Sequence, residues 1–107
     1  MPPTRAYLHD QVLEHKDDLL ELASNLIRIK SQSPIDSQRE VVDFVRGYLS
    51  SCGIESELLG PDPDYPCVYA GIGDASDGGF RVVLNGHVEV VPVCDLEGWM
   101  FDPFGGE

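Results

Sequence analysis

The chain has 107 residues, 42% of them hydrophobic, and a formal net charge of −12 at pH 7. This length allows at most one domain with a modest core, and the ordinary apolar content argues against disorder. The strong acidic charge argues against nucleic acid and anionic membranes as partners, since both would repel it. No apolar run approaches the roughly 20 residues of a membrane span, and the first residues do not resemble a signal peptide, so we expect a cytoplasmic protein.

The positions of the charged residues and of the cysteines limit the kinds of ligand and chemistry that we expect. Residues 51–107 carry eleven acids and one base, Arg81, which favours a cation as ligand, although a solvated acidic surface explains most of these charges. Cys52, Cys67 and Cys94 are odd in number and widely spaced, so we expect them to be reduced and structural or incidental. A catalytic thiol at Cys94 is the alternative, but no feature of the sequence supplies it with a base.

The first predicted element is an amphipathic helix over residues 10–30. Its apolar residues recur at helical spacing and form a broad stripe along one face. Residues 31–34, Ser-Gln-Ser-Pro, end this helix. The stripe consists of Val12, Leu19, Leu22, Leu26 and Ile29.

A second helix is predicted to follow at once. Ser37 and Glu40 have the spacing of a capping box, in which each side chain satisfies the free amide of the other. Gly53 is a plausible left-handed residue at the helix end. The expected buried face consists of Val41, Val42, Phe44, Val45, Tyr48 and Leu49.

Three strands are predicted after the helices. Residues 54–59 look like an edge strand, residues 67–72 like a second strand, and residues 80–86 like a third and most apolar one. The proline-rich loop 60–66 and the glycine-rich turn 73–79 separate them. Four aspartates of these connections are expected to act as turn formers rather than as calcium ligands: Asp62, Asp64, Asp74 and Asp77.

The order of elements predicts an α/β fold in which two N-terminal helices pack on a three-stranded mixed sheet. The third strand lacks alternation, which is typical of a strand covered on both faces. Two helices in a chain of this length cover only one face well. We therefore expect residues 1–107 to be the opening portion of a larger domain.

A histidine and a glutamate follow the most apolar run of the chain. His87 comes directly after Asn85-Gly86, and Glu89 lies two residues later, on the same side of an extended chain. A histidine at a strand end is a common zinc ligand, and its second ring nitrogen usually donates to a carboxylate. From this spacing alone, however, a histidine satisfied by nearby polar groups is the more common explanation.

The surrounding residues form a more specific pattern. Residues 84–93, Leu-Asn-Gly-His-Val-Glu-Val-Val-Pro-Val, are followed by Gly98-Trp99 and by the Asp-Pro-Phe of residues 102–104. This pattern resembles the first metal-binding signature of the co-catalytic zinc amidohydrolases and peptidases. That family includes acetylornithine deacetylase, succinyl-diaminopimelate desuccinylase, aminoacylase and glutamate carboxypeptidase. The order of the preceding helices and strands is also similar to its N-terminal region.

The resemblance implies a specific chemistry. Members of the family hold two zinc (or cobalt) ions that are bridged by an aspartate and a water. This water attacks the amide carbonyl of an N-acyl amino acid or small peptide, and a glutamate acts as the base. By this resemblance His87 is a metal ligand, and Glu89 is the acid that orients it. The family usually has aspartate at the position of Glu89, and the extra methylene moves the carboxylate by roughly a bond length. Such a displacement slows catalysis.

The remaining metal ligands, the base and the dimerisation domain follow the Asp-Pro-Phe stretch in the family. We therefore expect residues 1–107 to be the N-terminal portion of a catalytic domain, inactive alone and unable to hold metal stably. His9 and His15 are expected on the surface, and Glu107 matches no ligand position. The alternative is a non-catalytic, truncated or split-gene α/β module that folds with a partner, such as a complementing downstream chain.

The aromatic residues near the end of the chain allow two interpretations. Trp99, Phe101 and Phe104 lie in a stretch that packs around the site entrance in the family. A structural plug that covers the sheet is the preferred interpretation over a substrate pocket.

Overall fold

Residues 5–28 form two consecutive helical segments, α1 (Arg5–Glu14) and α2 (Lys16–Arg28). They belong to a computed structural model that describes residues 1–74, 76, 78–79 and 81–107. His15 separates the two segments, yet its amide donates to the Gln11 carbonyl (3.1 Å) and its carbonyl accepts from the Leu19 amide (3.0 Å). The α-helical bonding therefore continues across the junction. The predicted helix is confirmed, but it begins earlier, ends slightly sooner and is interrupted at His15.

The second predicted helix is α3 (Arg39–Ser51), and its C-terminal end follows the prediction closely. Gly53 has a φ of +76°, which a glycine adopts without a steric penalty. Its amide donates to the Ser50 carbonyl, and the Ile54 amide donates to the Leu49 carbonyl, each at 2.9 Å. These two bonds form a Schellman motif, which satisfies the last free carbonyls of the helix.

The predicted capping box at the start of α3 is wrong. Gln38 is the N-cap residue and makes no side-chain capping bond. The Ser37 hydroxyl accepts from the Arg39 amide at 3.3 Å and donates to the Asp64 carboxylate at 3.2 Å. The contact with Asp64 turns the serine toward the loop before β2, so Ser37 joins two segments instead of closing a reciprocal cap with Glu40.

Two glycines of α3 and its end provide a matched test of this geometry. Gly53→Ala is expected to lower the free energy of unfolding by about 1 kcal/mol, because alanine at positive φ is strained. Gly47→Ala lies inside α3 with nothing within 4 Å of the added carbon, and it should raise stability by about 0.5–1 kcal/mol. Urea unfolding followed by circular dichroism measures both. Equal signs for the two variants would contradict the Schellman geometry.

Only two strands are present in the described part of the chain. Strands β1 (Ser56–Leu59) and β2 (Cys67–Ala70) pair in an antiparallel hairpin, with Ser56 opposite Ala70 and Leu59 opposite Cys67. Both strands are shorter than predicted but fall inside the predicted ranges. The loop between them reaches back to the residues before α3: the Asp64 carbonyl accepts from the Gln38 amide at 2.8 Å.

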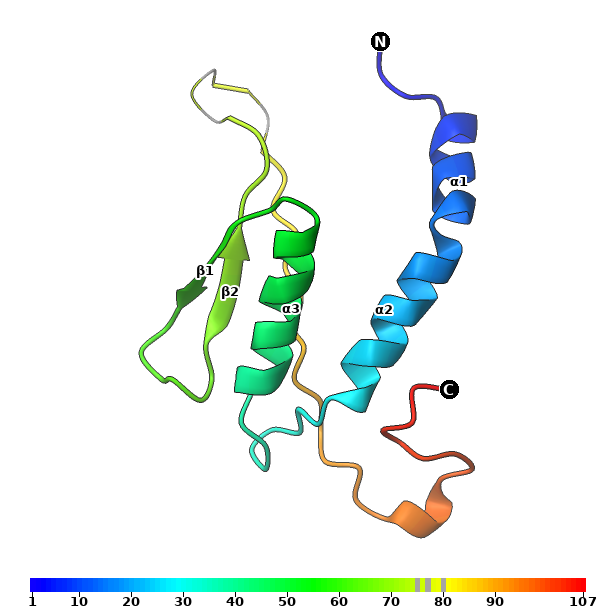
Figure 1. The fold of residues 1–107 in the computed structure, drawn as a ribbon, viewed down its shortest axis with the longest axis vertical. Helices are drawn as coiled ribbons and strands as arrows, with labels where there is room; N and C mark the ends of the chain where they lie inside the picture. Colours follow the sequence, from blue (N-terminus) through cyan, green and yellow to red (C-terminus); the bar gives the residue numbers. More distant parts are fainter. Residues whose placement is uncertain (75, 77, 80) are drawn as a thin grey trace.

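The helix α3 packs along the hairpin, whereas the α1–α2 rod (residues 5–28) stands apart from it (Figure 1). Arg46 of α3 ties the two layers together, because its guanidinium donates to the hydroxyl and to the carbonyl of Ser56 at 3.2 and 3.3 Å. The prediction of two helices on the sheet is therefore only half right. One helix covers the hairpin, and the other leads away from it.

The predicted third strand, residues 80–86, is wrong. Residues 81–86 form no strand, and Phe80 lies outside the described residues. Val82, Val83 and Leu84 expose between 82% and 93% of their surface. A strand of this composition is stabilised by cover on both faces, and within the described chain neither face of this run is covered. The three-stranded mixed sheet is thus replaced by a two-stranded antiparallel one.

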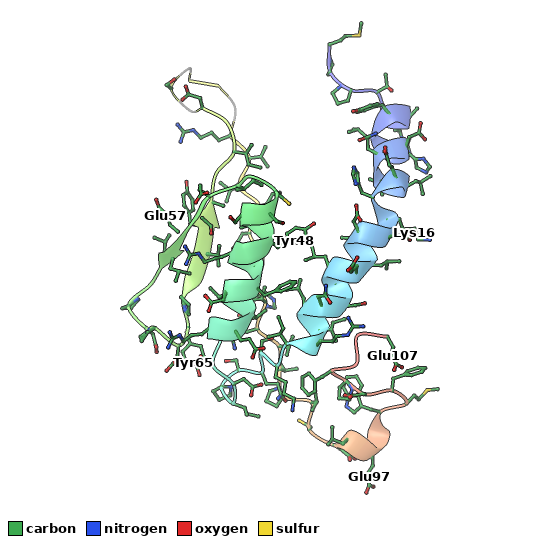
Figure 2. The ribbon with its side chains drawn as sticks, viewed as in Figure 1. Lys16, Tyr48, Glu57, Tyr65, Glu97 and Glu107 are labelled. Atoms are coloured by element: carbon green, nitrogen blue, oxygen red, sulfur yellow. The ribbon has the colours of Figure 1, made fainter. Side chains whose placement is uncertain are left out.

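The described part of the chain has a very small core. Val41 and Val42 are its only buried apolar residues, and many large apolar side chains are exposed. The radius of gyration is 17.0 Å, against roughly 13 Å for a compact domain of 100 residues. In Figure 2, Glu57 on the hairpin and Lys16 on the rod lie on opposite sides of an open molecule. Among the described residues, no helix combines the length and apolar character needed to cross a membrane.

Candidate functional site

The segment that carries the predicted metal ligand is bound to the connection between α2 and α3. Val90 forms an isolated parallel bridge with Gln32. The Val90 amide donates to the Ser31 carbonyl at 3.0 Å, and the Ser33 amide donates to the Val90 carbonyl at 2.8 Å. His87 lies three residues before this bridge. The prediction that His87 ends a strand is wrong, because residues 81–87 form no strand.

The His87 imidazole is hydrogen-bonded to the backbone of a residue two positions later in the chain. Its Nδ1 lies 3.0 Å from the carbonyl oxygen of Glu89 and 3.8 Å from a carboxylate oxygen of the same residue. A carbonyl oxygen can only accept, so Nδ1 must carry the proton and donate. In a neutral ring this leaves Nε2 with a free lone pair, which is the form of histidine that binds metal. The side chain is 76% exposed, so Nε2 is open to a ligand.

Glu89 has a different geometry from the one that the sequence suggests. Its carboxylate is half exposed, and at 3.8 Å it lies beyond hydrogen-bond distance of the ring, although it is close enough for an ion pair with a protonated imidazole. The backbone carbonyl of the same residue makes the hydrogen bond instead. The longer glutamate side chain therefore does not need to reach the ring for Nδ1 to have a partner.

The residues present fit a metal ion only in part. In the described part of the chain, no three histidine, cysteine or acidic side chains gather where they could hold an ion together. His9 and His15 pair with Asp10 and Asp18, at 3.7 and 3.4 Å, on the exposed rod. Their predicted surface positions are confirmed. A catalytic zinc needs about three protein ligands, so a zinc ion at His87 would need further donors from other residues.

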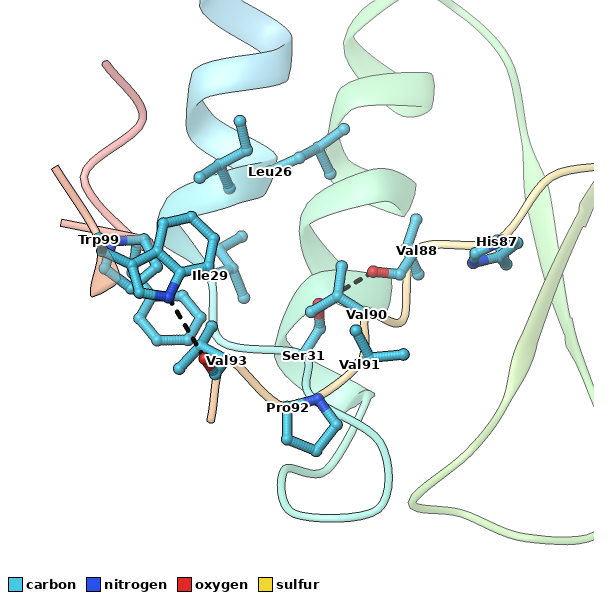
Figure 3. Close-up of a pocket in the computed structure, with 13 residues that line it drawn as sticks. Leu26, Ile29, Ser31, His87, Val88, Val90, Val91, Pro92, Val93 and Trp99 are labelled. Carbon is cyan, nitrogen blue, oxygen red and sulfur yellow. Dashed lines mark hydrogen bonds between the residues drawn. The ribbon is translucent and has the colours of Figure 1, made fainter. Parts of the chain in front are cut away.

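An apolar hollow of about 410 Å³ adjoins this segment (Figure 3). It is lined by Leu26 of α2, by Ile29 directly after α2, and by Trp99 together with five residues of the segment after His87: Val88, Val90, Val91, Pro92 and Val93. His87 lies at one end of the lining, where its ring meets the hollow and the solvent. The site therefore combines a free imidazole nitrogen with an adjacent apolar surface.

The aromatic residues at the end of the chain do not cover the sheet. Trp99 is half exposed and donates from its indole nitrogen to the Val93 carbonyl at 3.3 Å. The Phe104 ring lies under the Lys30 ammonium, 5.2 Å from the ring centre. These contacts place the segment beside the end of α2, away from the hairpin (Figure 1). The plug interpretation is therefore wrong as a cover for the sheet, and Trp99 and Phe104 instead line the hollow.

Two aspartates act as the predicted turn formers. The Asp62 carboxylate accepts from the Asp64 amide at 2.9 Å, and the Asp74 carboxylate accepts from the Ser76 amide at 2.8 Å. The bond from the Ser76 amide, with a further one from the Ser76 hydroxyl, lowers the pKa of Asp74. Asp77 lies outside the described residues. These carboxylates are thus occupied with local backbone rather than gathered around a cation.

The three cysteines are free, in agreement with the expectation that they are reduced, and all three are exposed. Cys94 has an unusual φ of +55°, and its thiol donates to the Pro92 carbonyl at 3.4 Å. The hydrogen-bond partner of the thiol is therefore a backbone carbonyl and not a side-chain base.

Sequence reasoning missed the residues that hold the site. Ser31 and Gln32 are buried and bind the 88–93 segment, although their composition suggested only the end of a helix. A signal was available, since a helix followed by polar residues and then a proline places side-chain donors beside unpaired backbone. The partner segment lies almost 60 residues away, however, and nothing local identifies it.

Comparison with known proteins gives a consistent picture. The chain is 32% identical over 99 residues to N-formyl-4-amino-5-aminomethyl-2-methylpyrimidine deformylase of Bacillus subtilis, covering 91% of this chain and 23% of that protein. It is 36% identical to succinyl-diaminopimelate desuccinylase of Methylocella silvestris, covering 82% of this chain and 22% of the relative. The desuccinylase of Ehrlichia chaffeensis is 37% identical, covering 83% and 23%.

The matched region limits what these relatives establish. The chain spans less than a quarter of the length of each of these curated proteins. No family model matches the chain, and no solved structure matches it significantly. By sequence, the chain belongs to the amidohydrolase family of these desuccinylases and deformylases, and it corresponds to the N-terminal part of those proteins.

Proposed function

We propose that residues 1–107 form the N-terminal portion of the catalytic domain of a zinc-dependent amidohydrolase, and that His87 is one of its metal ligands. The observation that carries this proposal is the hydrogen bond from His87 Nδ1 to the Glu89 carbonyl, which leaves Nε2 free and exposed. The family relationship supports the same assignment, since its members are hydrolases of N-acyl groups by name.

Each residue of the site has a distinct part in this proposal. His87 binds the ion through Nε2, and Glu89 orients the ring, through its carbonyl and through the charge of its nearby carboxylate. Zinc or cobalt, when bound, would polarise an amide carbonyl and make a water more acidic. The adjacent apolar hollow would hold the acyl group or the side chain of an N-acylated amino acid or small peptide.

The described residues supply one ligand of the several that a catalytic metal needs, so we propose that the chain alone is inactive. After dialysis against zinc and then against buffer, it should retain far less than one ion per chain. It should hydrolyse N-succinyl and N-formyl amino acids no faster than buffer does. Elemental analysis and a ninhydrin assay for released amine measure these two quantities. Stoichiometric metal together with turnover would overturn the proposed inactivity.

A second candidate function rests on the exposed apolar surface. Among the described residues, two valines are the only buried apolar ones, while the run Val82–Leu84 is exposed and the hollow is open. Exposed apolar surface of this kind is typical of a module that is completed by further polypeptide. A complementing chain would then restore the site in trans. Adding the separately expressed downstream part of a relative distinguishes the two candidate functions, because only a complementing module gains turnover without a covalent link to that part.

A further inference from the structure

The buried polar residues of this open molecule all lie in one place. Among the described residues only Ser31, Gln32 and Gln38 are buried and polar, with 3%, 8% and 5% of their surface exposed. Burying polar groups is costly unless they are hydrogen-bonded. Ser31 and Gln32 both bond the segment after His87, and Gln32 also bonds the nearby Asp36 carboxylate. The best-protected polar network of the chain therefore serves the candidate site.

Ser31 holds two successive peptide groups. Its hydroxyl donates to the Val88 carbonyl at 2.9 Å, which fixes the peptide group between Val88 and Glu89. Its carbonyl accepts from the Val90 amide at 3.0 Å, which fixes the peptide group between Glu89 and Val90. A peptide group is planar and trans, so its carbonyl points away from its own N–H. With the Val90 N–H directed at Ser31, the Glu89 carbonyl points the other way, and this oxygen accepts from His87 Nδ1.

Two glutamines hold Ser31 and the far end of the segment in place. Gln38 donates from its amide nitrogen to the Ser31 carbonyl at 3.1 Å. Gln32 accepts from the Val93 amide at 3.1 Å and donates to the Asp36 carboxylate at 3.0 Å. The backbone after His87 is thus fixed at Val88, Val90 and Val93.

We propose that Ser31 is a positioning residue for His87: by fixing the peptide groups around Glu89, it sets the direction of the Glu89 carbonyl and so the tautomer of the imidazole. The inference rests on the proposed function, because the tautomer matters for catalysis only if His87 binds metal. The positioning itself needs no metal and is measurable in this chain without one.

The test is the tautomer of His87 in three variants. Imidazole ¹⁵N shifts are recorded without metal at about pH 8.5, where imidazole side chains are neutral. Ser31→Ala removes the hydroxyl bond to the Val88 carbonyl and keeps the backbone bond to the Val90 amide. It should lower the ratio of the Nδ1–H to the Nε2–H form by up to about fivefold, the factor that a net hydrogen bond of about 1 kcal/mol supplies. Ser31→Cys fills the space with a weak donor and should fall between. Ser51→Ala removes a hydroxyl that bonds only the Tyr48 carbonyl, and it should change nothing.

The outcomes separate positioning from mere stability. Exposed His9, whose Nδ1 lies 3.7 Å from the Asp10 carboxylate, is measured in the same spectra as a reference ring outside the 88–93 segment. A Ser31→Ala chain that is less stable but keeps the wild-type ratio at His87 overturns the proposal. If Ser31→Ala does not fold, the tautomer ratio of His87 in Ser31→Cys decides by the same criterion. In the wild-type chain, the Val90 amide, which bonds the Ser31 carbonyl, must also exchange its hydrogen with solvent more slowly than the Val88 amide. If His87 supplied no metal ligand in a completed catalytic domain, the proposed function would be refuted and this result would still stand.

Discussion

Val41→Ala is expected to lower the free energy of unfolding by about 2 kcal/mol, a large share of the stability of so small a core. Val41 is 1% exposed and lies in the first turn of α3, the helix that packs on the hairpin. Removing its two methyl groups takes away buried apolar surface and leaves a cavity. With Val42 as the only other buried apolar residue among those described, little material is available to fill that cavity. Urea unfolding monitored by circular dichroism measures the loss.

The matched control is Val83→Ala. This substitution removes the same two methyl groups from a side chain that is 86% exposed, so its effect should stay within about 0.5 kcal/mol. A loss at Val83 as large as the loss at Val41 would contradict the exposed course of residues 82–84. It would mean instead that this run is covered in solution, by a second copy or by another part of the protein.

The elements that local sequence determines were predicted well. Helix periodicity located both helical regions, and the glycine at position 53 marked the end of α3 because only local backbone strain decides that residue. The hairpin strands followed from short apolar runs on either side of a proline-rich loop. In each of these cases the stabilising contacts lie within a few residues or between neighbouring elements.

The elements that depend on distant partners were not predicted. A run such as Val82–Leu84 encodes burial on two faces, but it becomes a strand only when other segments supply the neighbouring strand and the covering layers. At Ser31 the error was the opposite one, because burial was not predicted where it occurs. This segment resembles a simple helix stop, yet among the described residues it holds two of the three buried polar ones. The capping box failed for the same reason, because Asp64 competes for the Ser37 hydroxyl.

The candidate site was also predicted only in part: the features set by nearby residues were predicted, and those set by distant residues were not. The pattern around His87 pointed to a metal ligand through family resemblance, and the histidine-to-glutamate spacing predicted that these two residues would be adjacent, as they are. The sequence could not indicate that the backbone carbonyl of Glu89, rather than its carboxylate, is within hydrogen-bond distance of the ring. That distinction depends on the direction of one peptide group, which residues 31–33 fix from almost 60 positions away.

A chimera provides the strongest test of His87 as a ligand. Residues 1–107 would replace the matching first quarter of the Bacillus subtilis deformylase, to which they are 32% identical. With the downstream part of the relative present, we expect the chimera to hydrolyse the formyl substrate of that enzyme. His87→Ala should then lower kcat/KM by about a thousandfold, or about 4 kcal/mol of transition-state stabilisation, because it removes the proposed metal ligand.

Variants of the neighbouring residues make this test specific. Glu89→Ala keeps the carbonyl that bonds the ring and removes only the carboxylate 3.8 Å away, so it should cost about 10–100-fold, as residues that orient a ligand usually do. His15→Ala removes an exposed imidazole between α1 and α2 and should leave kcat/KM within about twofold. Bound zinc, measured on the same samples, should fall for His87→Ala and stay unchanged for His15→Ala. If His87→Ala keeps both its metal and its turnover in an active chimera, the coordinating imidazole of this family is not at position 87.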